Sequence, residues 1–95
     1  MKIVWSPEAI GDLISLRAYI AENYSAAALR TAQRIVQLIE DGLVENPSMG
    51  RPDRVPGTRE LVITRTPYVV PYRVRGDAIE ILRVYHGARP WPDAP

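Results

Sequence analysis

Apolar positions in the first quarter of the chain recur at helical spacing after a short strand-like start. Residues 2–5 form a β-prone run, and Ser6-Pro7 then supplies an N-cap serine followed by a proline in the first helical turn. The periodic pattern runs up to Asn23-Tyr24, where we expect the helix to end. Its predicted apolar face consists of Ile10, Leu13, Ile14, Ile20 and Ala21, with the aliphatic stem of Arg17 among them.

A second helix is expected directly after the first, because Ser25 can cap it. Its predicted apolar face consists of Ala28, Ala32, Ile35, Leu38, Ile39 and Leu43. We expect it to end before Asn46-Pro47, since the residue before a proline avoids the helical region. A connection this short predicts an antiparallel helical hairpin.

Residues 46–57 are rich in proline and glycine and are predicted to form a loop, after which three strands are expected. The predicted strands are Arg59–Thr64, Tyr68–Arg75 and Ala78–His86. Gly76-Asp77 suits a two-residue type II′ hairpin turn. The last strand is apolar on both faces, with Ile79 and Ile81 on one and Leu82 and Val84 on the other, which is typical of an interior strand. Pro71 cannot donate to a strand ladder, so we expect a bulge or an unpaired side there.

The predicted order is therefore β-α-α-β-β-β, an α+β fold in which an N-terminal helical hairpin packs on a small antiparallel sheet. We expect residues 1–95 to form a single domain, because 95 residues are the size of one and no linker interrupts them. A domain this small should be marginally stable alone, which favours a stabilising partner.

Composition excludes several classes of protein. The chain has no cysteine, so disulfides, thiolate nucleophiles and Cys-ligated zinc are absent, and we expect a cytoplasmic protein. No apolar run reaches the length of a membrane span, and the first residues do not resemble a signal peptide. A single histidine and no cysteine predict no metal site, and no glycine-rich phosphate loop is present, so we expect no cofactor.

Charge is unevenly distributed although the net charge is only +1. Residues 1–45 carry four basic and six acidic side chains, a net charge of −2. Residues 46–95 carry eight basic and five acidic side chains, a net charge of +3, and all eight basic residues are arginine. Because arginine binds carboxylates and phosphates through two parallel hydrogen bonds, this half predicts an anionic partner.

Seven short segments, in this order, resemble the RelE/ParE superfamily of toxins from type II toxin–antitoxin (plasmid stabilisation) systems. They are Val4–Ala9, Asp12-Leu13, Asn46-Pro47, Met49–Pro52, Arg59–Leu61, Tyr68–Val74 and Ile79–Arg89. The resemblance implies a toxin held inactive by a cognate antitoxin, an acidic protein that lies as a helix or strand along it. RelE-like members cut mRNA on the ribosome, whereas ParE-like members poison DNA gyrase and are not regarded as nucleases.

For the RelE-like alternative, the candidate catalytic residues are Arg65, Arg83 and His86. Cleavage at a ribose 2′-hydroxyl needs a base, a cation for the phosphate and an acid for the leaving oxygen. His86 could transfer protons, and Arg65 or Arg83 could hold the phosphate. The simpler alternatives are a surface histidine and an Arg83 paired with Glu80 or Glu60 across strands.

Other features favour the ParE-like alternative. Lys2 is the only lysine, which is unlike a ribosome-directed protein that binds many phosphates. Tyr85 and His86 are adjacent in a strand, so their side chains should face opposite sides. Binding of DNA gyrase requires only a complementary surface, for which Arg73, Arg89 and Trp91 are the candidate target-binding residues. We therefore favour a ParE-like gyrase poison over an mRNA endonuclease.

Overall fold

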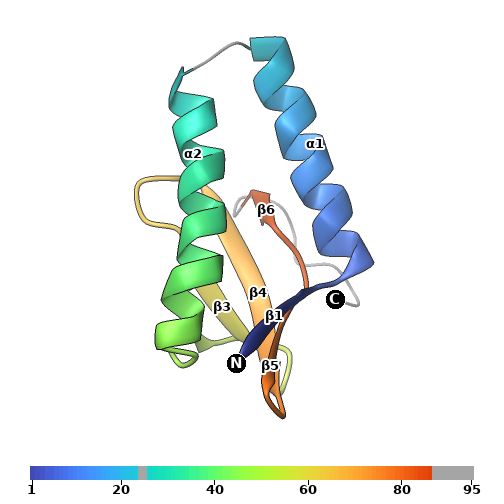
Figure 1. The fold of residues 1–95 in the computed structure, drawn as a ribbon, viewed down its shortest axis with the longest axis vertical. Helices are drawn as coiled ribbons and strands as arrows, with labels where there is room; N and C mark the ends of the chain where they lie inside the picture. Colours follow the sequence, from blue (N-terminus) through green and yellow to red (C-terminus); the bar gives the residue numbers. More distant parts are fainter. Residues whose placement is uncertain (24–25, 87–95) are drawn as a thin grey trace.

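A computed structural model describes residues 1–23 and 26–86 of the chain. The elements are β1 (Lys2–Trp5), α1 (Pro7–Asn23), α2 (Ala26–Gln37), a π-helical segment η1 (Leu38–Leu43), β2 (Arg51–Pro52), β3 (Arg59–Val62), β4 (Tyr68–Arg75), β5 (Ala78–Ile81) and β6 (Tyr85–His86). Figure 1 shows α1 and α2 running side by side, with β3 and β4 passing behind α2. The α+β fold with a helical pair on a sheet is confirmed.

The sheet is mixed, whereas the sequence predicted a purely antiparallel one. Its order is β1-β5-β4-β3-β2, and β6 pairs with β4. β1 lies parallel to β5, while the other pairs are antiparallel. A parallel neighbour is possible because the helical pair carries the chain between β1 and the later strands. β5 is interior, as its apolar sequence indicated, and β2 is a short strand within the segment predicted to be loop.

Helix α1 begins as the sequence predicts. The Ser6 hydroxyl accepts a hydrogen bond from the Ala9 amide at 3.0 Å and donates one to the Leu82 carbonyl at 2.9 Å. Ser6 therefore caps the helix and also ties its start to the chain after β5. The predicted cap of the second helix, Ser25, lies outside the described residues.

The core lies between the two helices and the inner face of the sheet. Ala9 and Leu16 of α1 are buried, but Ile10 and Ile14, predicted on the buried face, are 48% and 62% exposed. The reason is that α1 has two apolar stripes, and only the one containing Ala9 and Leu16 faces the sheet. The further core residues of the helical segments and sheet are Ala32, Ile35, Ile39, Leu43, Leu61, Val70, Tyr72, Ile79 and Ile81.

The π-helical segment η1 keeps the end of the second helix in phase with the core. Ile35, Ile39 and Leu43 follow one another at intervals of four residues, and all three are fully buried. In a regular α-helix a four-residue repeat drifts around the axis, because one turn takes 3.6 residues. A π-turn takes more residues, so it compensates for this drift. Helical conformation continues to Glu45, which confirms the predicted end before Asn46-Pro47.

The β4–β5 hairpin turns at Gly76-Asp77 as predicted. Arg75 pairs with Ala78, so two residues form the loop. Gly76 has a positive φ of 60°. Asp77 has a negative φ, because among residues 1–23 and 26–86 the only non-glycine residue with a positive φ is Arg65. Positive φ at the first central residue alone identifies a type II′ turn.

Candidate functional site

A β-bulge at Pro71 determines which way the candidate site residues point. Tyr72 pairs with Ile81 and Val69 pairs with Tyr85, so two residues of β4 lie opposite three residues, 82–84. The Pro71 carbonyl accepts a hydrogen bond from the Leu82 amide at 2.9 Å. A bulge therefore occurs where the missing donor of Pro71 predicted one.

The extra residue of the bulge changes the alternation of side chains along the last strand. Val84 belongs to the same core cluster as Ile79 and Ile81, so the prediction that it lies on the opposite face is wrong. Its neighbour Tyr85 is opposite Val69, and His86 is opposite Tyr68. Tyr85 and His86 consequently lie on opposite faces of the sheet, as their adjacency predicted.

Arg83 lies in this bulge and is bound to helix α1. Its Nε donates to Asp12 Oδ2 at 2.7 Å, and its Nη2 donates to Asp12 Oδ1 at 3.0 Å. The Val84 amide also donates to Asp12 Oδ2, at 2.9 Å. The hydrogen bond to Asp12 raises the pKa of Arg83. Asp12 takes the place of Glu80 and Glu60, the cross-strand partners expected for Arg83, because the bulge turns Arg83 toward α1.

The ion pair between Asp12 and Arg83 is largely shielded from solvent. The exposed fractions of the two side chains are 15% and 24%. A phosphate could reach the same two donors of Arg83 only by displacing the carboxylate of Asp12. The pairing of Asp12 with Arg83 was not predicted, although a carboxylate on the core-facing side of α1, between Ala9 and Leu16, was the available signal.

Tyr85 and His86 have contrasting environments. Tyr85 is 7% exposed. Its burial is the largest cause of a pKa raised to about 12, and the negative charges of Asp53 and Glu60 add to the effect. The Arg83 guanidinium carbon lies 5.8 Å from the Tyr85 ring centre. His86 is exposed, and its ring meets Tyr68 edge-on at 5.9 Å between centroids. Tyr85 therefore stays protonated at neutral pH and is unsuited to act as a base.

The remaining candidate arginines are spread over the sheet. Arg65 is exposed, in the turn between β3 and β4, and has a left-handed φ of 66°. Arg73 lies on β4, where its Nε donates to Glu80 Oε1 at 2.8 Å. The predicted target-binding residues Arg89 and Trp91 lie outside the described residues. The structure places Arg65 near the end of the sheet that carries His86, while Arg83 is engaged by α1.

Stability should fall at high pH because of Tyr85. In the unfolded chain its phenol ionises near pH 10, whereas in the folded chain it keeps its proton up to about pH 12. The stabilising effect is complete below pH 10 and disappears as the pH rises from 10 to about 12, because the folded state binds the proton more tightly. Urea unfolding across this range should show the decrease, and Tyr85→Phe should reduce it. If phenolate absorbance shows all five tyrosines ionising near pH 10, this explanation is wrong.

A groove of about 810 Å³ lies along the two helices. Its lining residues are Leu13, Arg17, Leu29, Ala32, Gln33, Val36, Gln37, Glu40 and Asp41. Leu29 is 50% exposed, and the exposed Ile10 and Ile14 lie on the same side of α1 as Leu13. The groove thus combines apolar walls with one basic residue and, at one end, two acidic residues.

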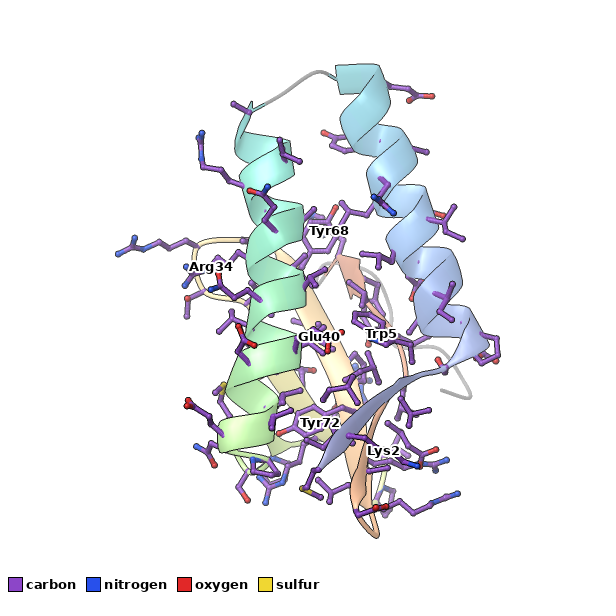
Figure 2. The ribbon with its side chains drawn as sticks, in the orientation of Figure 1. Lys2, Trp5, Arg34, Glu40, Tyr68 and Tyr72 are labelled. Carbon is purple, nitrogen blue, oxygen red and sulfur yellow. The ribbon has the colours of Figure 1, made fainter. Side chains whose placement is uncertain are left out.

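The acidic end of the groove is attached to the sheet. The Trp5 indole donates to Glu40 Oε1 at 3.2 Å, and Figure 2 shows the two side chains pointing toward each other. Because Glu40 belongs to η1, this bond connects the π-helical segment to β1. Trp5 therefore helps to hold Glu40, one of the acidic residues of the groove, in position.

The described residues contain neither a candidate metal site nor a helix that could span a membrane. No group of three or more His, Asp or Glu side chains among residues 1–23 and 26–86 could hold a metal ion. In the same part of the chain, no helix has the length and apolar character needed to cross a membrane.

Comparison with known proteins identifies the family. The family described as ParE toxin of type II toxin-antitoxin system, parDE, matches residues 3–91. Protein Y4kP of Sinorhizobium fredii is 42% identical over 91 residues, which cover 96% of this chain and 93% of that protein. Toxin RelE2 of Caulobacter vibrioides is 38% identical over 88 residues, which cover 93% of this chain and 97% of that toxin.

Solved structures agree with this assignment. A chain of the chromosomal ParDE TA system from P. aeruginosa has a TM-score of 0.75 and 36% identity, covering 90% of this chain and 95% of that chain. A chain of the RelBE2 toxin-antitoxin complex from Mycobacterium tuberculosis shares the fold, with a TM-score of 0.64 and 24% identity over 90% and 88% of the two chains. The fold and these similarities define a RelE/ParE superfamily toxin. Within that superfamily, the chain belongs to the ParE toxin family of type II toxin–antitoxin systems.

Proposed function

We propose that this protein is a cytoplasmic, plasmid-stabilising toxin that binds and poisons DNA gyrase and is neutralised by a cognate antitoxin. The observation that carries this proposal is the pair between Asp12 and Arg83. Arg83, one of the two arginines expected to hold a phosphate, is already bound at 2.7 and 3.0 Å by a shielded carboxylate. The role of Arg83 is then to fix α1 to the sheet, and the toxin acts on its target by binding and not by catalysis.

The chemistry of RNA cleavage supports the same choice. A nuclease of this kind needs a base, a phosphate-binding cation and an acid directed at one phosphodiester. Tyr85 remains protonated because its pKa is about 12, and it lies on the opposite face of the sheet from His86. Arg73 is paired with Glu80. We propose that Arg73, together with Arg89 and Trp91, contacts the target protein.

The alternative is a ribosome-dependent mRNA endonuclease. It is favoured by relatives that carry the names RelE1 and RelE2. In that case Arg65, Arg83 and His86 would be catalytic, and loss of either His86 or Arg83 would abolish toxicity.

Growth arrest by variants distinguishes these two functions. If the toxin acts by binding, His86→Ala and Arg65→Ala should still arrest growth when induced without antitoxin, within about threefold of the wild-type dose. Both side chains are exposed, so their removal should also leave the fold intact. Colony counts and protein levels measured after induction supply the comparison. Loss of arrest in either variant at equal protein level would favour the endonuclease.

The helical groove is the proposed docking site of the antitoxin. Among similar structures, one is described as a ParDE system and another as a toxin-antitoxin complex. An apolar groove between two helices suits the apolar face of an amphipathic helix. Arg17 would pair with an acidic residue of that helix, and Glu40 and Asp41 with a basic one. An extended antitoxin segment could also pair with β1, which is the edge strand of the sheet formed by the described residues.

Binding of the antitoxin should depend on Leu29. Leu29→Glu places a charge in the apolar wall of the groove and should weaken binding by roughly tenfold or more. Val74→Glu is the matched control, since Val74 is 43% exposed, like Leu29, but lies on β4 away from the groove. Calorimetry with the co-encoded antitoxin measures the difference. The wild-type complex should also melt above the isolated toxin, by linkage of folding and binding. Equal affinities of the two variants would exclude the groove.

A further inference from the structure

The side of the sheet that faces away from the helices carries a second surface, distinct from the groove. Side chains alternate across a sheet, so the residues opposite one another in register share a face. Val4, Glu80 and Arg73 form one row on this side, and Glu60 and Arg51 belong to the next. The outer sheet face is defined by Lys2, Val4, Arg51, Glu60, Val62, Arg73, Arg75 and Glu80.

The outer sheet face has an excess of positive charge. Its strands carry four basic side chains and two acidic ones, and Glu8 at the start of α1 adds a third acidic side chain at its edge. Glu80 is shared by Arg73 at 2.8 Å and Arg75 at 3.3 Å, and Glu60 is paired with Arg51 at 2.7 Å. Arg51 and Arg75 are nevertheless 71% and 66% exposed. One carboxylate cannot neutralise two guanidinium groups, so the face attracts an anionic partner.

The helical layer has the opposite charge. Residues 7–45 contain three basic and six acidic side chains, a net charge of −3. The two sides of the molecule therefore select partners of different character. A second copy of this chain is a poor partner for the outer sheet face in a symmetric arrangement, because it would bring like charges together.

The outer sheet face also contains a hollow of about 170 Å³. Val4 and Leu82 supply its apolar lining, and Ser6, Glu8, Arg73 and Glu80 complete its wall. Its size suits a single side chain of a partner, as in the pockets that receive interface anchors. Two glutamates in the wall repel phosphate and carboxylate groups at that point. The anchor should therefore be apolar, with carboxylates on either side of it that reach Arg51 and Arg75.

We propose that the outer sheet face binds an acidic protein segment in which an apolar anchor residue enters the hollow beside Arg73. Val4 and Val62, 40% and 44% exposed, add apolar contact around the charges. Apolar contact area beside arginine is common in protein interfaces, whereas nucleic-acid binding draws on many unopposed contacts to phosphates. The inference rests on the proposed function, because the segment is assigned to the toxin's target.

Paired variants of the toxin test this surface. Arg73→Gln/Arg75→Gln removes two charges from the outer sheet face, and Arg73→Lys/Arg75→Lys retains both. Arg30→Gln, on the exposed side of α2, controls for loss of positive charge elsewhere. For each variant, growth arrest is measured after induction without antitoxin. Binding is measured to isolated gyrase subunits and, separately, to a short DNA duplex.

The glutamine pair should lose binding and growth arrest by roughly tenfold, while the lysine pair and Arg30→Gln stay close to wild type. The antitoxin should still bind the glutamine pair, which shows that it is folded. If the pair does not fold, Arg75→Gln alone replaces it, because Arg75 is mostly exposed. The inference is overturned if the glutamine pair arrests growth normally, or if wild type binds the duplex through these arginines. If the glutamine pair loses growth arrest but wild type does not bind gyrase, the outer sheet face is supported as the binding surface and gyrase is not the target.

Discussion

Replacing Asp12 with alanine should destabilise the toxin by about 2–4 kcal/mol, a large share of the stability of a small domain. The change removes the carboxylate that binds Arg83 twice and also accepts the Val84 amide. It leaves a shielded guanidinium and a backbone donor without their acceptor. The melting temperature should fall by roughly 10–20 °C, since about 4–8 °C corresponds to 1 kcal/mol in a domain of this size.

A double-mutant cycle separates the ion pair from its surroundings. Asp12→Ala, Arg83→Ala and the double variant should give a coupling free energy of about 2 kcal/mol in urea unfolding. If Arg83 has this structural role, the Arg83→Ala variant loses toxicity because less of it is folded, and binding of the antitoxin should restore the solubility of the variant. A coupling near zero, with Arg83→Ala fully stable but non-toxic, would instead assign Arg83 a direct role at the target.

Gly50→Ala should be similarly destabilising, by about 2–4 kcal/mol. A Cβ atom at this position would lie 2.6 Å from Tyr72 Cε1 and 2.8 Å from the Glu60 carbonyl oxygen. Neither neighbour can move easily, because Tyr72 is fully buried and the other atom is backbone. The Gly50 amide donates to the Tyr72 hydroxyl at 2.8 Å, and that hydroxyl donates to the Pro47 carbonyl at 2.7 Å. The substitution therefore disturbs the hydrogen bonds through which Tyr72 of β4 holds the loop after η1.

Gly11→Ala is the matched control for this substitution. Gly11 is exposed in α1, and an added Cβ meets no atom within 4 Å. Alanine there should stabilise the protein by about 0.5–1 kcal/mol, because glycine is a poor helix former. Chemical unfolding of both variants measures the contrast. Equal effects at the two positions would show that the contact with Tyr72 is unimportant.

Local signals in the sequence identified most of the elements. The Ser6-Pro7 start, the type II′ turn at Gly76 and the bulge at Pro71 all depend on the chemistry of one or two residues, so the sequence reveals them directly. The parallel pairing of β1 with β5 involves residues more than 70 positions apart, such as Lys2 and Ala78. No local pattern specifies a pairing of that kind.

The site was harder to predict because its geometry depends on tertiary contacts. A strict two-residue alternation placed Val84 on the wrong face, since one extra residue in a bulge reverses it. The bulge also directs Arg83 to Asp12, 71 residues away, in place of Glu80. Helical periodicity placed Ile10 and Ile14 on the buried face of α1 and omitted Ala9 and Leu16, because only packing against the sheet decides which of the two apolar stripes is buried.

A supercoiling assay with purified gyrase and toxin released from its antitoxin tests directly whether gyrase is the target. We predict that the wild-type toxin stops supercoiling and causes cleaved DNA to accumulate, and that addition of the antitoxin reverses both effects. Unimpaired supercoiling at an excess of folded toxin, with codon-directed cutting of mRNA in a translation reaction by the same preparation, would show that the toxin is an endonuclease and that gyrase is not its target.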